Sequence, residues 1–420
     1  MLKRFGGIVL PLFVSLLLIG CSGNKKKDNK DVMVLWEPDI VVLGDLKPLD
    51  YIQYRLDSLL DNEPLVKKTH AAIMVYDLTL DTCVYGFNSQ ISMRPGSNQK
   101  ILTAITALDY LGHSYEFKTS VYYVGNIKNH TLIGDVVCVG GMDPAFDSVD
   151  MAAFVHSLKD LGVNSIQGRL VADKSFKDGF LWGAAWQWED YVNNPVLTPL
   201  PYDCKDQFLS CFEQCLSDNG VRCDVSTDEG LLPVGAKHLC TRTHSMDDIL
   251  SIMLKNSDNL YAESLFFQMG ASGDEPSDLH NSRNKVYNLI KKLGLDPRDY
   301  NIFDGCGLST FDYVSPEMMV YMLRYAYHQP DIIDHFLPYL PIAGVDGTLE
   351  DRMVGTPSQG LIHAKTGTVF GVSTLSGYCF LHNGHALCFS IMNMGGGTNR
   401  IYQFRMLQDK ICAAICRPED

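Results

Sequence analysis

The chain has 420 residues, of which 46% are hydrophobic and 20% are charged, and its formal net charge is -14. A chain of this length and composition can form two or more domains with buried cores. The acidic balance argues against nucleic acid as a partner, because phosphate binding needs clustered Lys or Arg side chains.

The first twenty residues have the pattern of an export signal. Lys3 and Arg4 precede an apolar run over residues 5–19. This run is shorter than the roughly 20 residues that cross a bilayer, so the pattern favours a signal peptide over residues 1–20. A retained transmembrane helix is the alternative.

A cysteine follows this apolar run in a context that predicts lipidation. The string Leu18-Ile19-Gly20-Cys21 resembles a bacterial lipoprotein cleavage box. We therefore expect Cys21 to become the lipidated first residue, which would anchor the chain to a membrane of the cell envelope, on the periplasmic side or in the outer membrane. We expect residues 21–34, which are polar from Ser22 to Lys30, to form a tether that holds the folded part off the membrane surface.

Ser97 and Lys100 stand at the start of a predicted helix. After Pro95-Gly96, apolar residues recur at roughly helical spacing over residues 101–111. Residues three apart share a helix face, so the serine hydroxyl and the lysine amine can reach each other. Burial and the positive end of the helix disfavour the ammonium form, which would let Lys100 take the serine proton. The alternative is a helix cap beside a surface lysine.

The same Ser-x-x-Lys spacing occurs at Ser22 and at Ser282, so the context must decide between the copies. Ser22 lies in the polar tether, which has no periodic apolar face. Ser282 lies in a polar stretch before Val286 and Ile290, where we expect a solvated helix start. Only Ser97 opens a long apolar helical pattern.

A long interval of 160 positions separates Ser97 from the next motif, at Ser257. One helical subdomain would need far less chain than this. Short runs with Gly and Pro between them are typical of strands within the interval. We therefore predict a β-rich inserted domain over residues 118–243. The expected strands cover residues 120–124, 131–139, 166–172 and 221–225.

The thirteen cysteines of the chain suit an oxidising envelope compartment. Their spacings match no common zinc module, and no His-Glu-x-x-His string occurs, so we expect no metal site. Cys412 and Cys416 lie one helical turn apart on an apolar pattern and are expected in the core. Disulfides are possible among four cysteines inside the predicted insert, Cys204, Cys211, Cys215 and Cys223.

The string Ser257-Asp258-Asn259 forms a polar break between two apolar helical patterns, over residues 249–254 and 260–267. Polar side chains at such a break would face a cleft. Ser245 and Asp248 have the spacing of a capping pair that begins the first of these helices. A purely structural turn between the helices is the alternative.

A second Ser-Asp-Asn string occupies residues 217–219. It follows an apolar segment and runs directly into Gly220, which is a common way for a helix to end. We interpret this copy as the C-terminal turn of a helix, so Ser257 is the candidate for a functional serine.

The triplet Lys365-Thr366-Gly367 occurs once and precedes a predicted hairpin. Strand-like runs over residues 374–381 and 386–394 flank the turn His382-Asn383-Gly384-His385. We therefore place Lys365 on a strand next to this hairpin. Gly367 would let a substrate backbone approach the strand closely. An exposed strand lysine is the alternative.

Together these motifs supply a serine nucleophile, an adjacent base, a second hydroxyl with an amide, and a cation on a strand, as in β-lactamases and penicillin-binding proteins. The chain resembles the class C low-molecular-mass penicillin-binding proteins, which are D-alanyl-D-alanine carboxypeptidases/endopeptidases. Cys306 departs from the family's more common serine, and residues 186–203 match only loosely. Further strings that carry the resemblance are Val139 to Pro144, Asn256 to Leu265, Asp304 to Ser309, Leu340 to Leu349 and Lys365 to Tyr378.

The resemblance implies an α/β (α+β) fold of the penicillin-binding and serine β-lactamase-like transpeptidase type, in which helices flank an antiparallel sheet. The serine DD-peptidase domain would then comprise residues 35–117 and 244–420. The β-rich domain would interrupt it.

The resemblance also implies roles for the four motif residues that carry the reaction. Ser97, deprotonated by Lys100, would attack the penultimate D-alanine of a peptidoglycan stem peptide and form an acyl-enzyme, which water hydrolyses. Ser257 and Lys365 would relay the proton to the leaving amine. β-Lactams would acylate Ser97 as substrate mimics. No metal or organic cofactor is implied.

Substrate contacts follow from the same resemblance. Asn259 would hold the amide on the acyl side, and Thr366 with Thr368 would receive the terminal carboxylate. The backbone N–H groups of Ser97 and Thr368 would form the oxyanion hole.

Two alternatives remain open from sequence alone. A β-lactamase would carry the same trio, but it would lack the long interruption, and no deacylating glutamate can be placed. A peptidoglycan-binding lipoprotein without turnover would keep the fold and the motifs. The sequence also leaves open whether the enzyme trims terminal D-alanine, cuts cross-links, or does both.

Overall fold

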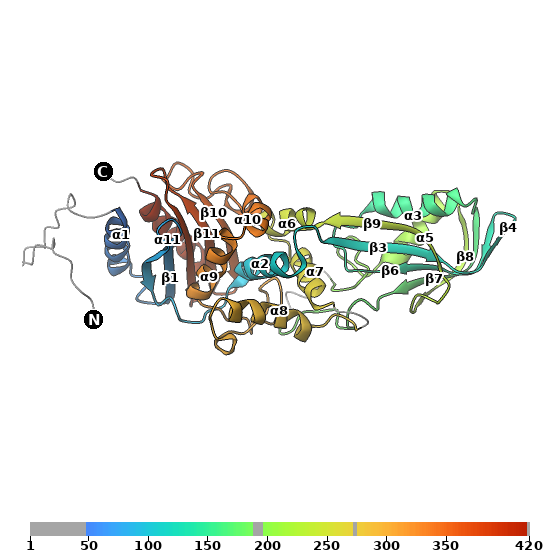
Figure 1. Cartoon of the computed structure of the whole chain (residues 1–420), viewed down its shortest axis with the longest axis horizontal. Helices are drawn as coiled ribbons and strands as arrows, with labels where there is room; N and C mark the ends of the chain where they lie inside the picture. Colours follow the sequence, from blue (N-terminus) through green and yellow to red (C-terminus); the bar gives the residue numbers. More distant parts are fainter. Residues whose placement is uncertain (1–47, 188–195, 272–274, 418–420) are drawn as a thin grey trace, which may run out of the picture.

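The computed structural model describes residues 48–187, 196–271 and 275–417. These residues form an elongated molecule with a β-sheet toward each end and a group of helices between the sheets (Figure 1). Cys21, the tether and the predicted signal peptide lie outside the described residues. Within the described ranges, no helix is both long and apolar enough to cross a membrane.

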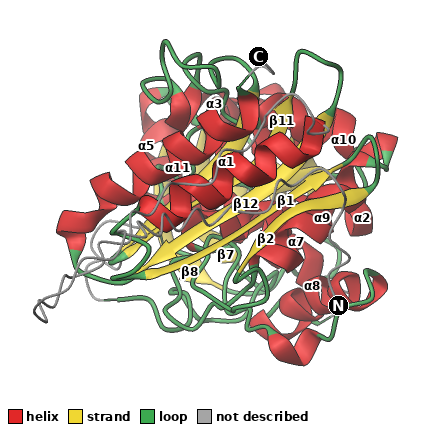
Figure 2. Ribbon diagram, turned by 90° about the vertical axis from the view of Figure 1, so that its left-hand side faces the viewer, coloured by secondary structure: helices red, strands yellow, loops and turns green. Residues whose placement is uncertain are grey.

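One sheet has five antiparallel strands in the order β10-β11-β12-β1-β2. Alternate residues of β1 face opposite sides, because successive side chains of a strand point to opposite faces. Ile73 and Val75 pack with α1 and α11, while Ala72 and Met74 pack toward α9 (Figure 2). The predicted hairpin is confirmed as β11 and β12. The bounds are β1 (His70–Asp77), β2 (Thr82–Phe87), β10 (Ile362–Val369), β11 (Val372–Phe380), β12 (Ala386–Met394), α1 (Pro48–Asn62) and α11 (Ile401–Cys416).

The helical part surrounds α2 (Gln99–Leu111), whose residues from Gln99 to Leu108 are all buried. Helices α6 to α10 all contact α2. The predicted capping pair begins α6, since Ser245 and Asp248 each accept a hydrogen bond from the other's backbone N–H. The bounds are α6 (Met246–Lys255), α7 (Asn259–Gly270), α8 (Leu279–Lys292), α9 (Pro316–Tyr327) and α10 (Pro330–Phe336).

Ser282 begins a helix as expected, but it is not solvated. It lies in the first turn of α8, is fully buried, and donates a hydrogen bond to the Asp278 carbonyl at 2.8 Å. The reason is packing against α7, since a Cβ on Gly270 would lie 2.2 Å from the Ser282 hydroxyl oxygen. The close approach of the two helices therefore excludes water from this serine.

The second sheet, in the order β4-β5-β7-β6-β3-β9 with β8 paired to β7, lies between residues 116 and 245. Parallel pairs join β7 to β5, β6 and β8. Two helices, α3 and α5, pack on it through aromatic residues that include Phe154 and Phe212. The bounds are β3 (Glu116–Tyr123), β4 (Asn126–Lys128), β5 (Thr131–Ile133), β6 (Val136–Val139), β7 (Ser165–Asp173), β8 (Arg222–Glu229), β9 (Lys237–Ser245), α3 (Ser148–Asp160) and α5 (Phe208–Asp218).

The interval between the motifs thus holds helices as well as strands. The strand expected over residues 131–139 is divided into β5 and β6, which both pair with β7. Between them, the backbone of Asp135 exchanges hydrogen bonds with Val124. Helix α5 ends at Asp218, as the second Ser-Asp-Asn string predicts. The domain boundaries at residues 118 and 243 stay predictions.

All cysteines in the described part of the chain are free thiols, so no disulfide joins the four in the insert. Cys412 and Cys416 lie on α11 and are buried in the core, as expected. The Cys416 sulfur lies 3.0 Å from that of Cys379 on β11.

Candidate active site

Ser97 lies in a 3-10 turn, Gly96–Asn98, that leads directly into α2. The turn packs against β10 and β11. The Asn98 Nδ2 atom donates to the Ser376 Oγ atom on β11 at 2.6 Å, and both side chains are fully buried. Ser97 itself is partly exposed. The turn therefore holds an accessible hydroxyl in a fixed position relative to the sheet.

Two glycines allow this close approach of turn and sheet. Gly96 has φ +51°, and a Cβ on it would lie 3.2 Å from the Thr368 backbone nitrogen. A Cβ on Gly367 would lie 2.1 Å from the Thr374 hydroxyl oxygen and 2.6 Å from the Pro95 carbonyl oxygen. We expected Gly367 to make room for a substrate backbone. In the structure it makes room for the turn that carries Ser97, and its role toward a substrate backbone stays a prediction.

Lys100 is completely buried beside Ser97. Its Nζ atom lies 3.2 Å from Ser97 Oγ, 2.8 Å from Asn259 Oδ1 and 2.9 Å from the Cys306 carbonyl oxygen. Burial lowers the pKa of Lys100, although the nearby groups Cys306, Asp304, Glu263 and Asp258 act in the opposite direction. The surface-lysine alternative is therefore excluded.

Ser257 lies in the short turn between α6 and α7, with φ +63°. Such a backbone conformation is uncommon for a serine. Asp258 is the N-cap of α7, and its side chain accepts a hydrogen bond from the Tyr261 N–H. Asn259 is therefore the first residue of the helix and lies next to the turn. The helix thereby presents Asn259 Oδ1 to Lys100. The structure brings the second motif and the first together through this bond.

Lys365 lies on β10 and is fully buried, so the exposed-lysine alternative is wrong. Its Nζ atom donates to the Thr366 carbonyl at 3.0 Å. Burial and the neighbouring charge of Lys100 lower its pKa well below the ordinary value. The effect of the Lys100 charge on Lys365 is consistent with a short distance between the first and third motifs. The turn that carries Ser97 packs directly on the strand that carries Lys365.

Two further residues meet the threonines of β10. Thr348 lies in the string Leu340 to Leu349 that carries the resemblance, but no role was expected for it, and no sequence motif pointed to Arg405. The Thr366 hydroxyl donates to the Thr348 hydroxyl at 2.8 Å. Arg405 reaches from α11, and its Nη2 atom donates to Thr368 Oγ1 at 3.2 Å. Thr368 is exposed. A guanidinium therefore lies next to the threonine that we expected to receive a carboxylate.

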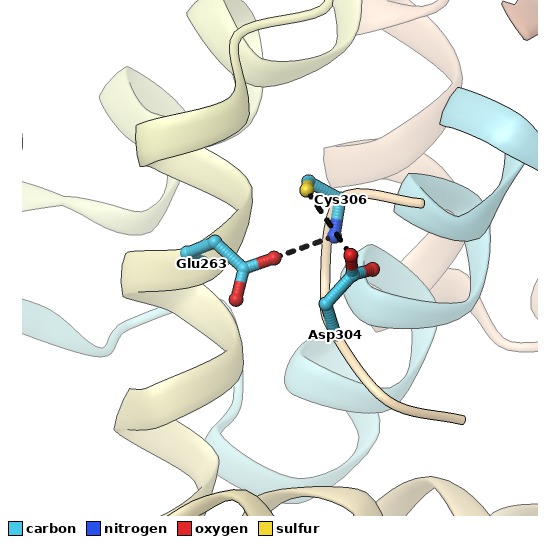
Figure 3. Close-up of side chains that lie close together, drawn as sticks. All are labelled: Glu263, Asp304 and Cys306. Atoms are coloured by element: carbon cyan, nitrogen blue, oxygen red, sulfur yellow. Dashed lines mark hydrogen bonds between the residues drawn. The ribbon is translucent and has the colours of Figure 1, made fainter. Parts of the chain in front are cut away.

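The loop from Asp304 to Ser309 supplies the carbonyl that accepts from Lys100. Glu263, on α7, accepts from the backbone N–H groups of Gly305 and Cys306 through its Oε1 atom, at 2.8 Å each. Figure 3 shows the bond to Cys306. Asp304 accepts from the N–H groups of Gly307 and Ser309. These two buried acidic side chains therefore hold four backbone N–H groups of the loop.

Glu263, Asp304 and Cys306 bring three potential metal ligands within 4.8 Å of one another. Their chemistry suits hydrogen bonding to the loop rather than metal binding. The carboxylate oxygens already accept backbone N–H bonds, and burial raises the pKa of the Cys306 thiol well above its ordinary value. A thiol must lose its proton to bind a metal.

The fold matches that of penicillin-binding proteins. The structure of penicillin-binding protein 4 (dacB) from Haemophilus influenzae superposes with a TM-score of 0.76 and 20% identity, covering 87% of this chain and 98% of that one. A predatory peptidoglycan endopeptidase from Bdellovibrio bacteriovorus superposes with a TM-score of 0.54 and 17% identity, covering 81% and 90%. The predicted fold class is confirmed.

The chain belongs to the D-Ala-D-Ala carboxypeptidase 3 (S13) family, whose model matches residues 52–200 and 202–412. The D-alanyl-D-alanine carboxypeptidase DacB of Haemophilus influenzae is 24% identical over 82% of this chain and 93% of its own length. A D-alanyl-D-alanine carboxypeptidase from an Actinomadura species is 25% identical over 81% of this chain and 80% of its own length. The resemblance that the motifs indicated is thus confirmed at the level of the family.

Proposed function

We propose that this protein is a penicillin-sensitive serine DD-peptidase that cleaves peptidoglycan stem peptides through an acyl-enzyme on Ser97. The observation that carries the proposal is the buried Lys100 amine at 3.2 Å from the Ser97 hydroxyl. Membership of a D-Ala-D-Ala carboxypeptidase family supports the substrate class.

The contacts of Lys100 suit a neutral general base. A neutral amine has two N–H donors and one lone pair. Asn259 Oδ1 and the Cys306 carbonyl are acceptors, so they take the two N–H groups and leave the lone pair directed at Ser97. Ser97 then donates its proton to Lys100 as its oxygen attacks the carbonyl carbon of the penultimate D-alanine.

Departure of the terminal D-alanine requires a proton on its nitrogen. We assign this transfer to Ser257 and Lys365, since burial favours the neutral form of the Lys365 amine. A neutral amine can accept the proton that Lys100 took from Ser97 and pass it through Ser257 to the leaving nitrogen. Collapse of the tetrahedral intermediate breaks the C–N bond and leaves the ester on Ser97. Water then hydrolyses that ester.

The substrate would lie along the edge strand β10. Thr366 and Thr368 would bind the terminal carboxylate, and Arg405 supports this role because its guanidinium contacts Thr368. Asn259 would hold the amide on the acyl side. β10 pairs with β11 along one edge, and residues 341–343 bond to its other edge from Ile362 to Ala364. We propose that an added strand binds the part of this edge that follows Ala364.

The oxyanion hole is assigned to the backbone N–H groups of Ser97 and Thr368. Gly96 supports this assignment because it brings the turn into contact with the Thr368 nitrogen. Loss of one such donor typically costs about 3 kcal/mol of transition-state stabilisation.

Carboxypeptidase and endopeptidase activities use the same acyl chemistry on different leaving groups. The similar proteins carry both names, a carboxypeptidase in Haemophilus influenzae and an endopeptidase in Bdellovibrio bacteriovorus. We propose that this chain accepts both substrates in the cell envelope, where a lipid on Cys21 would anchor it. Digestion of purified cross-linked and uncross-linked muropeptides measures the two activities separately.

Labelling with a fluorescent penicillin tests the central proposal. The wild-type protein is expected to form a stable fluorescent adduct that is absent in Ser97→Ala. A binding module without turnover would stay dark, and a β-lactamase would release hydrolysed penicillin rapidly. Either of those results would reject the proposal.

A further inference from the structure

The carbonyl of Cys306 is one of the two acceptors that orient the Lys100 amine. Its position depends on a loop pressed between two helices. From α2, Thr103 donates to the Gly305 carbonyl at 2.7 Å and Gln99 donates to the Asp304 carbonyl at 3.2 Å. The Cys306 carbonyl therefore lies next to the part of the loop that α2 holds. The same helix carries Lys100.

From the other side, α7 holds the same loop through one side chain. Glu263 accepts from the N–H groups of both Gly305 and Cys306, so it fixes the peptide unit directly before the Cys306 carbonyl (Figure 3). Asn259 lies one helical turn before Glu263 on α7, and residues four apart share a helix face. One face of α7 thus supplies both acceptors of Lys100, the first directly and the second through the loop.

Glycines make this arrangement possible. A Cβ on Gly305 would lie 2.5 Å from the Phe266 Cβ atom and 2.8 Å from the Ala262 carbonyl oxygen, both on α7. Gly307 has φ +90°, and a Cβ there would lie 1.9 Å from the Gly96 carbonyl oxygen. The loop is therefore in contact with α7 and with the turn that carries the nucleophile.

We propose that Glu263 is a positioning residue for the acylation step, because it holds the Cys306 carbonyl in place. That carbonyl accepts one N–H of Lys100 and so leaves the lone pair of the amine directed at Ser97. The inference rests on the proposed function. According to this inference, a buried glutamate increases the acylation rate without contacting the substrate or the nucleophile.

The protonation of Glu263 suits this role. Burial and the nearby Asp304 raise its pKa to about 8, so the side chain is largely neutral at pH 7. It acts through the acceptor oxygen Oε1 and not through a charge. A glutamine at this position offers the same acceptor and the same size.

The experiment compares Glu263→Gln, Glu263→Leu and Glu263→Asp with the wild type. The acylation rate constant and the dissociation constant of the noncovalent complex are measured separately with a chromogenic cephalosporin by stopped flow. Leucine removes the acceptor, and aspartate is too short to reach both N–H groups. We expect each to lower the acylation rate constant by about a hundredfold, as a misplaced catalytic group does, with little change in the dissociation constant. Glutamine is expected to keep most of the rate.

A matched control is Asp150→Asn, because Asp150 is another buried carboxylate, in α3 beside the distant sheet, and accepts the Asp147 N–H. Its loss is expected to leave acylation unchanged. Rates near wild type in both Glu263→Leu and Glu263→Asp would overturn the inference, as would equal losses in Glu263→Gln. If Glu263→Leu does not fold, Glu263→Asp decides. A wild-type protein that is not acylated at Ser97 would instead reject the proposed function.

Discussion

Asn98 and Ser376 are 278 positions apart in the chain, and the amide of Asn98 donates to the hydroxyl of Ser376 at 2.6 Å. The bond is buried and joins the turn of the nucleophile to the middle of β11. Ser376 in turn donates to Ser390 on β12. The position of Ser97 is therefore coupled to the centre of the sheet.

Removal of this hydroxyl should destabilise the protein. In Ser376→Ala the buried amide of Asn98 loses its partner, which typically costs about 1–3 kcal/mol. The free energy of unfolding from urea titration measures the effect. Ser210→Ala serves as control, since the Ser210 hydroxyl is exposed and bonds only locally. Equal stability of the two variants would contradict the prediction.

The two Ser-x-x-Lys copies in the described part of the chain offer a test of the general base. Lys100→Met should lower the acylation rate by about 10² to 10⁴-fold, the usual contribution of a general base. Lys285→Met, at the other copy, should leave the rate unchanged, because Lys285 bonds to the Tyr110 hydroxyl on the surface. Measuring acylation of both variants by a fluorescent penicillin decides. Equal losses of the acylation rate in both variants would show that lysine at this spacing matters only for folding.

Glu263 predicts a pH dependence of stability. The pKa of Glu263 is raised from its ordinary value of 4.5 to about 8 in the folded protein. Between these two pH values, the folded state keeps a proton on Glu263 that the unfolded state has released. Stability from this group is therefore complete at low pH and is lost as the pH rises through that window. Glu263→Gln should lose less stability than the wild type between pH 5 and 8. Urea titrations at several pH values measure the difference, and identical slopes would be inconsistent with a raised pKa.

Gly367 should not tolerate a side chain. In Gly367→Ala the new Cβ would meet the Thr374 hydroxyl and the Pro95 carbonyl, so the nucleophile turn must shift. A shift of about 1 Å can cost a hundredfold in rate. Gly397→Ala is the control, since a Cβ there meets nothing within 4 Å. The prediction fails if both variants are acylated at the wild-type rate.

Arg405 should matter more for peptides with a free terminal carboxylate than for those without it. If its guanidinium helps Thr368 to bind that group, Arg405→Ala should lower kcat/KM for a D-Ala-D-Ala peptide by about tenfold or more. Hydrolysis of the peptide and of its C-terminal amide should be compared, with Arg400→Ala as control. An equal loss for peptide and amide would argue against carboxylate binding.

Local patterns were enough to predict the elements next to the three motifs. The helix after Ser97, the capping pair before α6 and the Asn-Gly hairpin after Lys365 are all encoded within a few residues of each motif. Strand β9 was missed because its sequence is largely polar and its residues are half-exposed, so it lacks the alternation that indicates a strand. Helix α3 was missed although Asp147 and Asp150 have the spacing of a capping box.

Glu263 and Arg405 could not be identified from local patterns. Nothing near Glu263 in sequence indicates that its partners are two N–H groups some 40 positions later. Arg405 meets Thr368 only because α11 folds back over the sheet. Residues whose importance comes from tertiary contacts alone need the structure, or an alignment, to be found.

The pairing of β1 with β12 has a consequence for how the molecule is made. Residues 70–77 can pair early with β2, but their other neighbour, β12, is complete only when residues 386–394 have been synthesised. The sheet between residues 116 and 245 needs no such distant partner and can form earlier. If Ser97 and Lys365 act together as proposed, a chain interrupted before β12 would contain both residues without the closed sheet that positions them, and we expect it to be unreactive.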